Sequence, residues 1–350
     1  MTRAVIRDSL PKEQRSVAVV DMSANLAGLE MTSPILTASG CAAAGRELDQ
    51  FFDITELGAV VTKSIMLEPR SGRPTPRMAE TPSGMLNSIG LQGPGIASFV
   101  ERDLVWLHQR GARTVVSIAG DSVEDYAKLA KILRMHEGVD AIEVNISCPN
   151  VADRGKVFAC EANSASAVVQ AVRRNTDSRI PIFAKLSPDV TDITSIAIAC
   201  VRAGADGLSV INTLLGMVID TDTMKPALAG VTGGLSGPAI RPVAVRCVWQ
   251  IRQALPDVPI LGMGGIRTGL DALQFILAGA NAVSVGTVVF NDPTAPMRVH
   301  RELSEALASK GFRSLAEAVS YAHRSGDEII VNEAEAPSDG DGADQDLDQM

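Results

Sequence analysis

Aromatic side chains are scarce in this sequence, and long apolar runs are absent. Aromatics make up 3% of the 350 residues, whereas hydrophobic residues make up 46%. The core must therefore be built from Ala, Val, Ile and Leu, which suits the buried parallel strands of an α/β protein. No apolar run approaches the roughly 20 residues that a membrane helix needs. Residues 2–16 are polar and charged, so we expect neither a signal peptide nor a membrane anchor.

Cysteine and histidine pairs at metal-ligand spacing are also lacking. The four histidines form no ligand spacing with one another, and the five cysteines contain no CxxC pair, so no metal site is predicted. Free thiols and a reducing, cytoplasmic setting are expected. The five are Cys41, Cys148, Cys160, Cys200 and Cys247, of which Cys200 and Cys247 fall in helical patterns and are expected to serve packing.

Basic residues are missing from the end of the chain. Residues 327–350 hold nine acids and no Lys or Arg, so they supply the whole net charge of −9 (32 − 41). The remainder is close to neutral and lacks the basic face that a nucleic-acid binder needs. We expect a polar extension over residues 1–16, one folded domain over residues 17–325, and an acidic, disordered tail over residues 326–350.

Short apolar runs alternate with helical patterns along the folded part. Each run has four to six residues, as expected for strands buried on both faces. Helices are predicted over residues 123–135, 165–174, 193–203, 241–254 and 269–278, with a final helical segment over 303–323 and a hairpin over 19–30 that closes the barrel bottom. The eight predicted strands cover residues 34–38, 59–62, 114–118, 141–146, 182–186, 207–211, 260–263 and 282–285.

Eight such units predict an α/β fold of the (β/α)₈ TIM barrel type. A doubly wound open sheet is the alternative, but no GxGxxG follows the first strand. Long active-site loops are predicted after strands 2, 4 and 6. The connections after strands 2 and 6, residues 64–113 and 212–258, are longer than ordinary connections.

The carboxyl ends of the strands, where barrel enzymes carry their sites, are all polar or glycine. Lys63 and Lys185 follow apolar strands, where an unpaired buried cation is costly. Each lysine either reaches solvent, meets an acid, or binds an anion or oxygen ligand, and we favour ligand binding.

"GMGGI" and "SVGT" end strands 7 and 8, where bare backbone N–H groups can approach a phosphate. A tight turn is the alternative for Gly264 and Gly265. A mononucleotide-sized cofactor such as FMN suits this set.

The hexamer "NISCPN", residues 145–150, ends strand 4. Asn145 and Asn150 carry donors and acceptors that can hold a planar ring of C=O and N–H groups. Cys148 has an unperturbed thiol pKa of about 8.5, close enough to neutrality for a proton acceptor. A small buried thiol that caps a turn is an equally good interpretation of the hexamer alone.

Together with "NISCPN", several further stretches resemble class 1 dihydroorotate dehydrogenase. They are "NSIGLQGPG", "VTKS", "FAKLSPDVTDI", "INTLLG", "TGGLSGPAI", "GMGGI" and "SVGT", in order from about residue 17 to 322. The stretch "PRMAETPSGMLNSIGLQGPG" is similar to the NAD-linked, type B catalytic subunit. The resemblance implies an FMN barrel that oxidises dihydroorotate to orotate in pyrimidine synthesis.

The resemblance also implies residue roles. Cys148 would be the base that removes the C5 proton while hydride leaves C6 for flavin N5, and Lys185 would stabilise negative charge on the reduced ring. The substrate would be held by Lys63, Asn87, Ser88, Ile89, Gly90, Leu91, Asn145, Asn150, Asn212 and Thr213. The flavin would be held by Ser39, Lys63, Ser64, Ser117, Asn145, Lys185, Ile211, Gly237, Gly264, Gly265, Gly286 and Thr287.

The family relation implies partners as well. A homodimer is expected, or a heterotetramer with a second subunit that carries FAD and a [2Fe–2S] cluster, because this chain has no four-cysteine cluster motif. The alternatives are a fumarate-reducing type A enzyme, an enzyme like dihydropyrimidine dehydrogenase, and a catalytically silent ligand-binding barrel. Two departures stand out: Ser117 replaces the family's usual asparagine, and "SGCAAAGREL" lacks aromatic residues.

Overall fold

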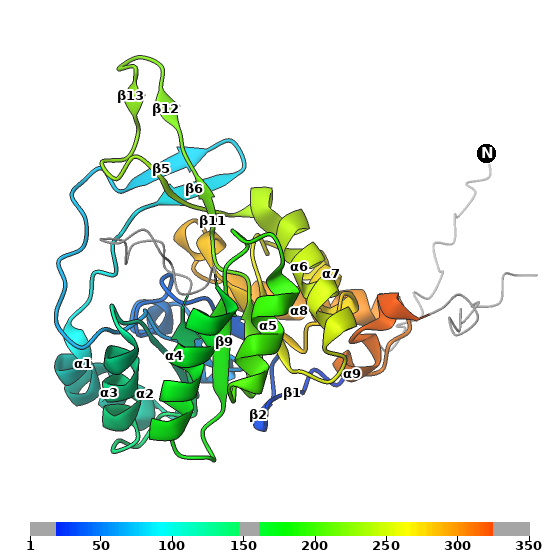
Figure 1. The fold of residues 1–350 in the computed structure, drawn as a ribbon. Coiled ribbons are helices and arrows are strands. Elements are labelled where there is room, and N and C mark those ends of the chain that lie inside the picture. The colour runs from blue at the N-terminus through cyan, green and yellow to red at the C-terminus, as the bar shows by residue number, and fades with distance from the viewer. Residues whose placement is uncertain (1–18, 147–160, 325–350) are drawn as a thin grey trace, which may run out of the picture.

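Eight parallel strands form the wall of a barrel in the computed structural model, which describes residues 19–146 and 161–324 (Figure 1). Hydrogen bonding joins the strands in the order β3-β16-β15-β10-β9-β8-β7-β4. A parallel bridge from Leu36 to Ala59 and a 2.8 Å bond from Gly58 N to Ile35 O close the ring. The predicted barrel is confirmed, with strands β3 (Ile35–Thr37), β4 (Val60–Val61), β7 (Thr114–Ile118), β8 (Ala141–Asn145), β9 (Ile182–Leu186), β10 (Gly207–Val210), β15 (Ile260–Met263) and β16 (Ala282–Val285).

Helices cover the outside of this wall. Five predicted helices are found, and the last helix begins earlier than its pattern indicated, at Ala295. Three of them are capped by side chains typical of helix starts: Ser122, Asp192 and Thr268 each accept a bond from a first-turn N–H. The main helices are α3 (Val123–Leu133), α4 (Ala162–Asn175), α5 (Ile193–Arg202), α6 (Arg241–Ala254), α7 (Gly269–Leu277) and α8 (Ala295–Ser309).

Shorter helices complete the outer layer. The first insertion ends in one continuous helical stretch, made of α1 (Gly95–Ser98), the π-helical turn η3 (Phe99–Leu104) and α2 (Val105–Arg110). Gly111 ends it in the left-handed conformation, with φ 76°, which glycine adopts without a Cβ clash. The remaining turns are η1 (Leu48–Gln50), η2 (Ile54–Glu56), η5 (Pro238–Ile240), η6 (Thr287–Phe290), α9 (Leu315–Ala318) and η7 (Tyr321–His323).

A hairpin lies at the amino ends of the barrel strands. It consists of β1 (Ala24–Leu26) and β2 (Leu29–Met31), which pair antiparallel. Leu26 is fully buried and Met31 is 2% exposed, so the hairpin adds its apolar face to the core. The predicted hairpin over residues 19–30 is thereby confirmed at the side opposite the insertions (Figure 1).

Two distant loops pair to build a second, antiparallel sheet above the barrel mouth. The loop after β4 supplies β5 (Met78–Thr81) and β6 (Gly84–Asn87), and the loop after β10 supplies β11 (Leu214–Gly216) and β14 (Gly233–Ser236). Their order is β11-β14-β6-β5, and the small hairpin β12 (Ile219–Asp220) with β13 (Lys225–Pro226) projects beyond them (Figure 1). The loop after β8 was predicted to be long, and its residues 147–160 lie outside the described residues.

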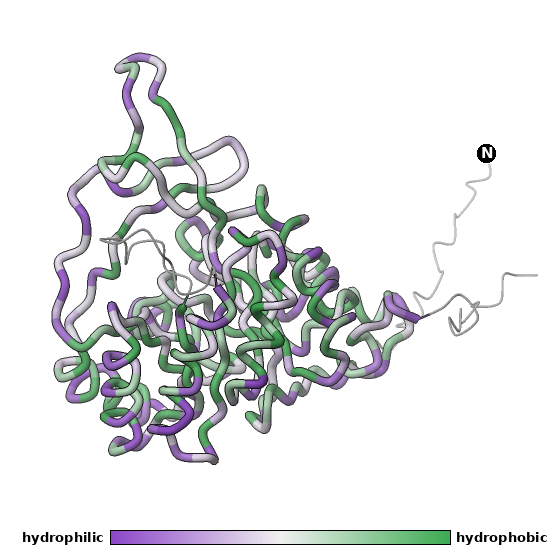
Figure 2. The backbone as a smooth tube through the Cα atoms, in the orientation of Figure 1, coloured by the Kyte–Doolittle hydropathy of each residue, from purple (hydrophilic) through white to green (hydrophobic). Residues whose placement is uncertain are grey.

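The core is aliphatic, as the composition required. Hydrophobic residues follow the barrel strands and inner helix faces, while hydrophilic residues lie on the outer helix faces (Figure 2). Cys200 and Cys247 are buried in α5 and α6 at 0% and 1% exposure, in agreement with their predicted packing role. Among the described residues, no helix combines the length and the apolar content that crossing a membrane requires.

Candidate active site

A chain of hydroxyl groups joins the ends of the first three barrel strands. Ser39 Oγ lies 3.3 Å from Ser64 Oγ, and Ser64 Oγ lies 2.9 Å from Ser117 Oγ. Ser64 and Ser117 are 3% and 0% exposed, so the bond between them forms away from water. Three residues predicted to hold the cofactor are therefore in contact with one another.

Asn145 ties the end of β8 into the same chain. Its Nδ2 donates to Ser64 Oγ at 2.9 Å, and its Oδ1 accepts from Asn212 Nδ2 at 3.4 Å. The hydroxyl of Tyr126 donates to the backbone carbonyl of Asn145 at 2.8 Å and so fixes the strand end itself. Asn145 is 6% exposed, and its amide is oriented from two directions.

A carboxylate that the sequence analysis did not select completes the chain. Glu143, on β8, is fully buried, and its Oε1 accepts from Ser117 Oγ at 3.0 Å and from Lys185 Nζ at 3.4 Å. Lys185 itself is 4% exposed. The lysine therefore meets an acid, as one of the alternatives held. The signal was present in the sequence, because an acid within the apolar run "AIEVN" has to find a partner in the barrel.

A cavity at the barrel mouth has a volume of about 640 Å³. That falls within the roughly 300–1,000 Å³ of small-molecule sites. Its wall combines residues from the ends of β3, β9, β10, β15 and β16 with the insertion sheet. Ten of the predicted site residues line it: Ser39, Lys185, Ile211, Asn212, Thr213, Gly237, Gly264, Gly265, Gly286 and Thr287.

The glycines permit close approach of backbone segments here. Gly264 and Gly265 have φ of 129° and 78°, in the region that disfavours side chains. A Cβ on Gly265 would lie 2.7 Å from Gly237 O, and one on Gly286 would lie 3.3 Å from Cys41 Sγ. The tight-turn explanation therefore holds for Gly264 and Gly265, while their main chain also forms part of the cavity wall.

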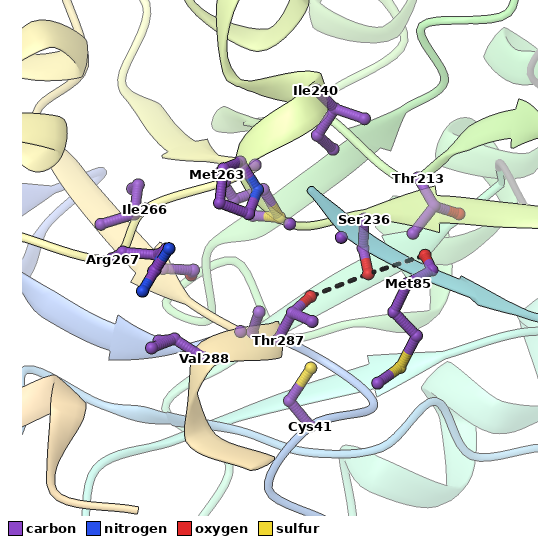
Figure 3. A pocket seen from close by; sticks show the side chains of 18 of the residues that line it. Cys41, Met85, Thr213, Ser236, Ile240, Met263, Ile266, Arg267, Thr287 and Val288 are labelled. Atoms are coloured by element: carbon purple, nitrogen blue, oxygen red, sulfur yellow. Dashed lines mark hydrogen bonds between the residues drawn. The ribbon is translucent and has the colours of Figure 1, made fainter. Parts of the chain in front are cut away.

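The insertion sheet supplies a part of the cavity that sequence reasoning missed. Residues 80–85, at the β5–β6 turn, line it, and Ser236 Oγ links Thr287 Oγ1 at 2.8 Å to Met85 O at 3.4 Å (Figure 3). A Cβ on Gly84 would lie 2.0 Å from Ser236 O, so glycine is needed at that contact. No sequence signal pointed to this contact, because it depends on the pairing of two loops about 150 residues apart.

Cys41 also lines the cavity (Figure 3). Burial raises the pKa of its thiol to about 11, although the positive charges of Lys185 and Lys63 oppose the shift. A pKa in that range keeps the thiol mainly neutral at physiological pH.

Lys63 lines a neighbouring cavity of about 440 Å³, together with Arg46, Arg70 and Gln92. It stays close to the first cavity, because its Nζ lies 3.7 Å from the point that a Cβ on Gly40 would occupy. Lys63 and Lys185 both act electrostatically on Cys41, which places the two cations around one edge of the barrel mouth.

The segment predicted to contact substrate after β6 is held by its own loop. Ser88 N donates to Arg77 O at 2.8 Å, and Ser88 Oγ accepts from Arg73 Nη1 at 3.3 Å. Asn87 Nδ2 donates to Gly234 O at 3.3 Å. Asn87, Ser88, Ile89, Gly90 and Leu91 line neither of these two cavities, nor do Ser64, Ser117 and Asn145. Cys148 and Asn150 lie outside the described residues.

The barrel with glycine-bearing ends on β15 and β16 is an arrangement typical of (β/α)₈ barrel enzymes, whose sites lie at this mouth. Comparison with known proteins identifies the family. Residues 21–307 match the family model described as dihydroorotate dehydrogenase, and the chain therefore belongs to the dihydroorotate dehydrogenase family.

Curated relatives agree along most of their length. The chain is 50% identical over 301 residues to the dihydroorotate dehydrogenase B (NAD(+)) catalytic subunit of Desulforudis audaxviator, which covers 86% of this chain and 97% of the relative. Subunits of the same name from Geobacter sp. strain M21 and Geotalea daltonii are 48% and 47% identical over 296 and 303 residues. These two alignments cover 85% and 87% of this chain, and 96% and 98% of the relatives.

Proposed function

We propose that this chain oxidises dihydroorotate to orotate in pyrimidine synthesis, as the catalytic subunit of an NAD-linked enzyme. The observation that carries the proposal is one cavity in which Lys185, Asn212, Thr213 and the glycine ends of β15 and β16 meet. Identity of 50% to a catalytic subunit of that name, over 86% of the chain, supports the same reaction.

The residues present fit a flavin mononucleotide. Gly264, Gly265 and Gly286 leave main chain in the cavity wall, and the hydroxyls of Ser236 and Thr287 lie beside them, which together suit a phosphate. Lys185 supplies a cation at another part of the wall, where a flavin ring system would carry negative charge after reduction. FMN supplies the two-electron chemistry when it is bound.

The predicted substrate residues support an anionic, planar ligand. Lys63 carries a positive charge near the mouth, which favours the carboxylate of dihydroorotate. The amides of Asn145 and Asn212 lie 3.4 Å apart and offer both donors and acceptors to ring C=O and N–H groups. We assign Asn87, Ser88, Ile89, Gly90, Leu91, Asn150 and Thr213 to the substrate as well, on the family resemblance.

Cys148 is proposed as the base. Its sulfur would take the proton from C5 of dihydroorotate as the C5=C6 bond of orotate forms, while the C6–H bond gives up its hydrogen and both electrons as hydride, for which a bound flavin would be the acceptor. Cys41 does not compete for this role, because burial raises the pKa of its thiol to about 11.

The electrons are proposed to pass onward to NAD⁺ through a partner subunit that carries FAD and a [2Fe–2S] cluster. The relatives' name of catalytic subunit supports such a partner. We propose a heterotetramer built on a homodimer of this chain.

One spectrum tests the proposal. The purified chain should be yellow, release FMN on denaturation, and lose its flavin absorbance when dihydroorotate is added without oxygen. A colourless protein would support a silent barrel instead. Assays with NAD⁺ plus the partner subunit, and with fumarate alone, separate the NAD-linked enzyme from a type A enzyme, because only the latter reduces fumarate.

A further inference from the structure

Glu143 is a buried carboxylate that the proposed reaction does not use. Its side chain is fully buried in the barrel wall, and Oε1 accepts from Ser117 and Lys185. Within the described part of the chain, Oε2 is buried and has no hydrogen-bond partner. A buried charge with an unsatisfied oxygen is costly, so it calls for an explanation beyond packing.

Among the residues that the structure describes, the charged group in contact with Glu143 is Lys185. Its Oε1 lies 3.4 Å from Lys185 Nζ, and the two side chains are 0% and 5% exposed. Lys185 lines the 640 Å³ cavity, whereas Glu143 does not. Lys185 therefore lies between the Glu143 carboxylate and the cavity. Glu143 can influence a ligand in the cavity only indirectly, through its contact with Lys185.

The contact between Glu143 and Lys185 affects both the position of the ammonium group and the electrostatic potential in the cavity. The lysine side chain is a flexible stem, and a fixed acceptor at one of its three N–H groups limits where the ammonium can lie. In a buried site a charge pair is weakly screened, so the carboxylate also lowers the positive potential that Lys185 directs into the cavity. Ser117 holds the same Oε1 from the other side at 3.0 Å.

Building on the proposed flavin site, we propose that Glu143 is a positioning residue that sets the reduction potential of the bound flavin by acting through Lys185. Glu143 orients the ammonium group of Lys185 toward the cavity, and its negative charge partly offsets the positive charge of that group. The reduced, more negative form of the cofactor is consequently held less tightly than it would be by an unpaired lysine.

Glu143→Gln tests the charge while it keeps the shape. The amide oxygen still accepts from Ser117 and Lys185, but the negative charge is removed. We expect the variant to bind reduced flavin about tenfold more tightly relative to oxidised flavin, which raises the two-electron midpoint potential by about 30 mV. The readout is a spectroscopic redox titration of the full chain with its bound flavin.

Asp140→Asn is the matched control, because Asp140 precedes the same strand and accepts from Thr114 N at 2.7 Å. It lies three residues from Glu143, about 10 Å along a strand, at the far end of the barrel. Its removal takes away the same charge, and the potential should stay at the wild-type value. Equal shifts in both variants would reduce the Glu143 effect to a general charge effect and overturn the proposal.

A double-mutant cycle with Lys185→Gln tests the route of action. If Glu143 acts through the lysine, adding Glu143→Gln to Lys185→Gln should not shift the potential further. Should Glu143→Gln not fold, Glu143→Asp carries the test, because it retracts the carboxylate by one methylene. The potential should then rise by less than 30 mV, and a zero or negative shift contradicts the proposal.

The proposed flavin site and the role of Glu143 fail in different ways. A colourless wild-type protein would show that no flavin is bound, and it would refute the proposed flavin site. A yellow wild-type protein with an unshifted Glu143→Gln variant leaves the flavin site intact and removes only the role of Glu143. Loss of flavin from folded Glu143→Gln, with flavin retained in Asp140→Asn, also overturns it, since Glu143 would then serve to build the site.

Discussion

Asn145 Nδ2 donates a hydrogen bond to Ser64 Oγ across 2.9 Å, which joins the end of β8 to the residue that follows Lys63 after β4. The same hydroxyl contacts Ser117 at 2.9 Å and Ser39 at 3.3 Å. One small side chain thus orients an amide proposed for substrate binding and connects three strand ends. Its removal should affect the ligand site more than its size suggests.

We predict that Ser64→Ala raises the KM for dihydroorotate about tenfold and lowers stability by about 1–3 kcal/mol. The reason is that buried donors and acceptors on its neighbours lose their partner. Ser209→Ala is the control, because Ser209 is buried yet has no hydrogen-bond partner within the described residues. It should be neutral in steady-state assays and in urea unfolding. Equal effects of the two substitutions would contradict a specific role for Ser64.

Cys148→Ala should keep bound flavin and lose flavin reduction by dihydroorotate at neutral pH. A hydrophobic methyl group cannot accept the C5 proton, whereas the cofactor contacts proposed here do not involve Cys148. Anaerobic stopped-flow absorbance measures the reduction rate directly. Cys200→Ala changes a thiol buried in α5 and should retain the wild-type rate. Reduction of Cys148→Ala at an undiminished rate would remove Cys148 from the mechanism.

The sequence predicted the barrel well, because each strand is a short apolar run that can be recognised from neighbouring residues alone. All eight strands and five helices followed from short apolar runs that alternate with helical patterns. The second sheet was not predictable, because β6 pairs with β14 through residues far apart, such as Leu86 and Leu235. Short strands of mixed polarity have no periodic pattern, so the sequence does not indicate which strand pairs with which.

The site was predictable for the same local reason, and only in part. Lys185, Gly264 and Gly286 stood at strand ends and meet in one cavity. Glu143 was overlooked, because one acid in an apolar strand says nothing of which cation it will face. The β5–β6 turn was likewise missed, since its place on the cavity depends on the pairing of β6 with β14.

Gly265→Ala should weaken FMN binding more than tenfold and lower the free energy of unfolding by about 1 kcal/mol. The residue has φ 78°, which disfavours alanine, and the added Cβ would lie 2.7 Å from Gly237 O in the cavity wall. Fluorescence titration of the apoprotein with FMN measures the affinity.

Gly28→Ala is the control for strain alone. Gly28 has φ 86°, and no atom of the described residues lies within 4 Å of the Cβ that would be added. It should show a smaller loss of stability, because strain acts there without a clash, and an unchanged FMN affinity. If the two variants bind FMN equally well, Gly265 does not belong to the cofactor site.

His300 should make stability depend on pH near neutrality. Burial lowers the pKa of its imidazole below 6.5, against a smaller opposing effect of Glu56, and its Nδ1 lies 3.3 Å from the buried Ser33 hydroxyl. The unfolded chain therefore binds more protons than the folded chain as pH falls through 6.5. The contribution of the neutral histidine to stability is present above that pH and is lost below it, so stability rises with pH in this window.

Urea unfolding at pH 7.5 and 5.5 should show that the wild type loses more stability on acidification than His300→Gln, whose amide carries no titrating proton. Identical losses would show that His300 takes up its proton as readily in the folded chain as in the unfolded one.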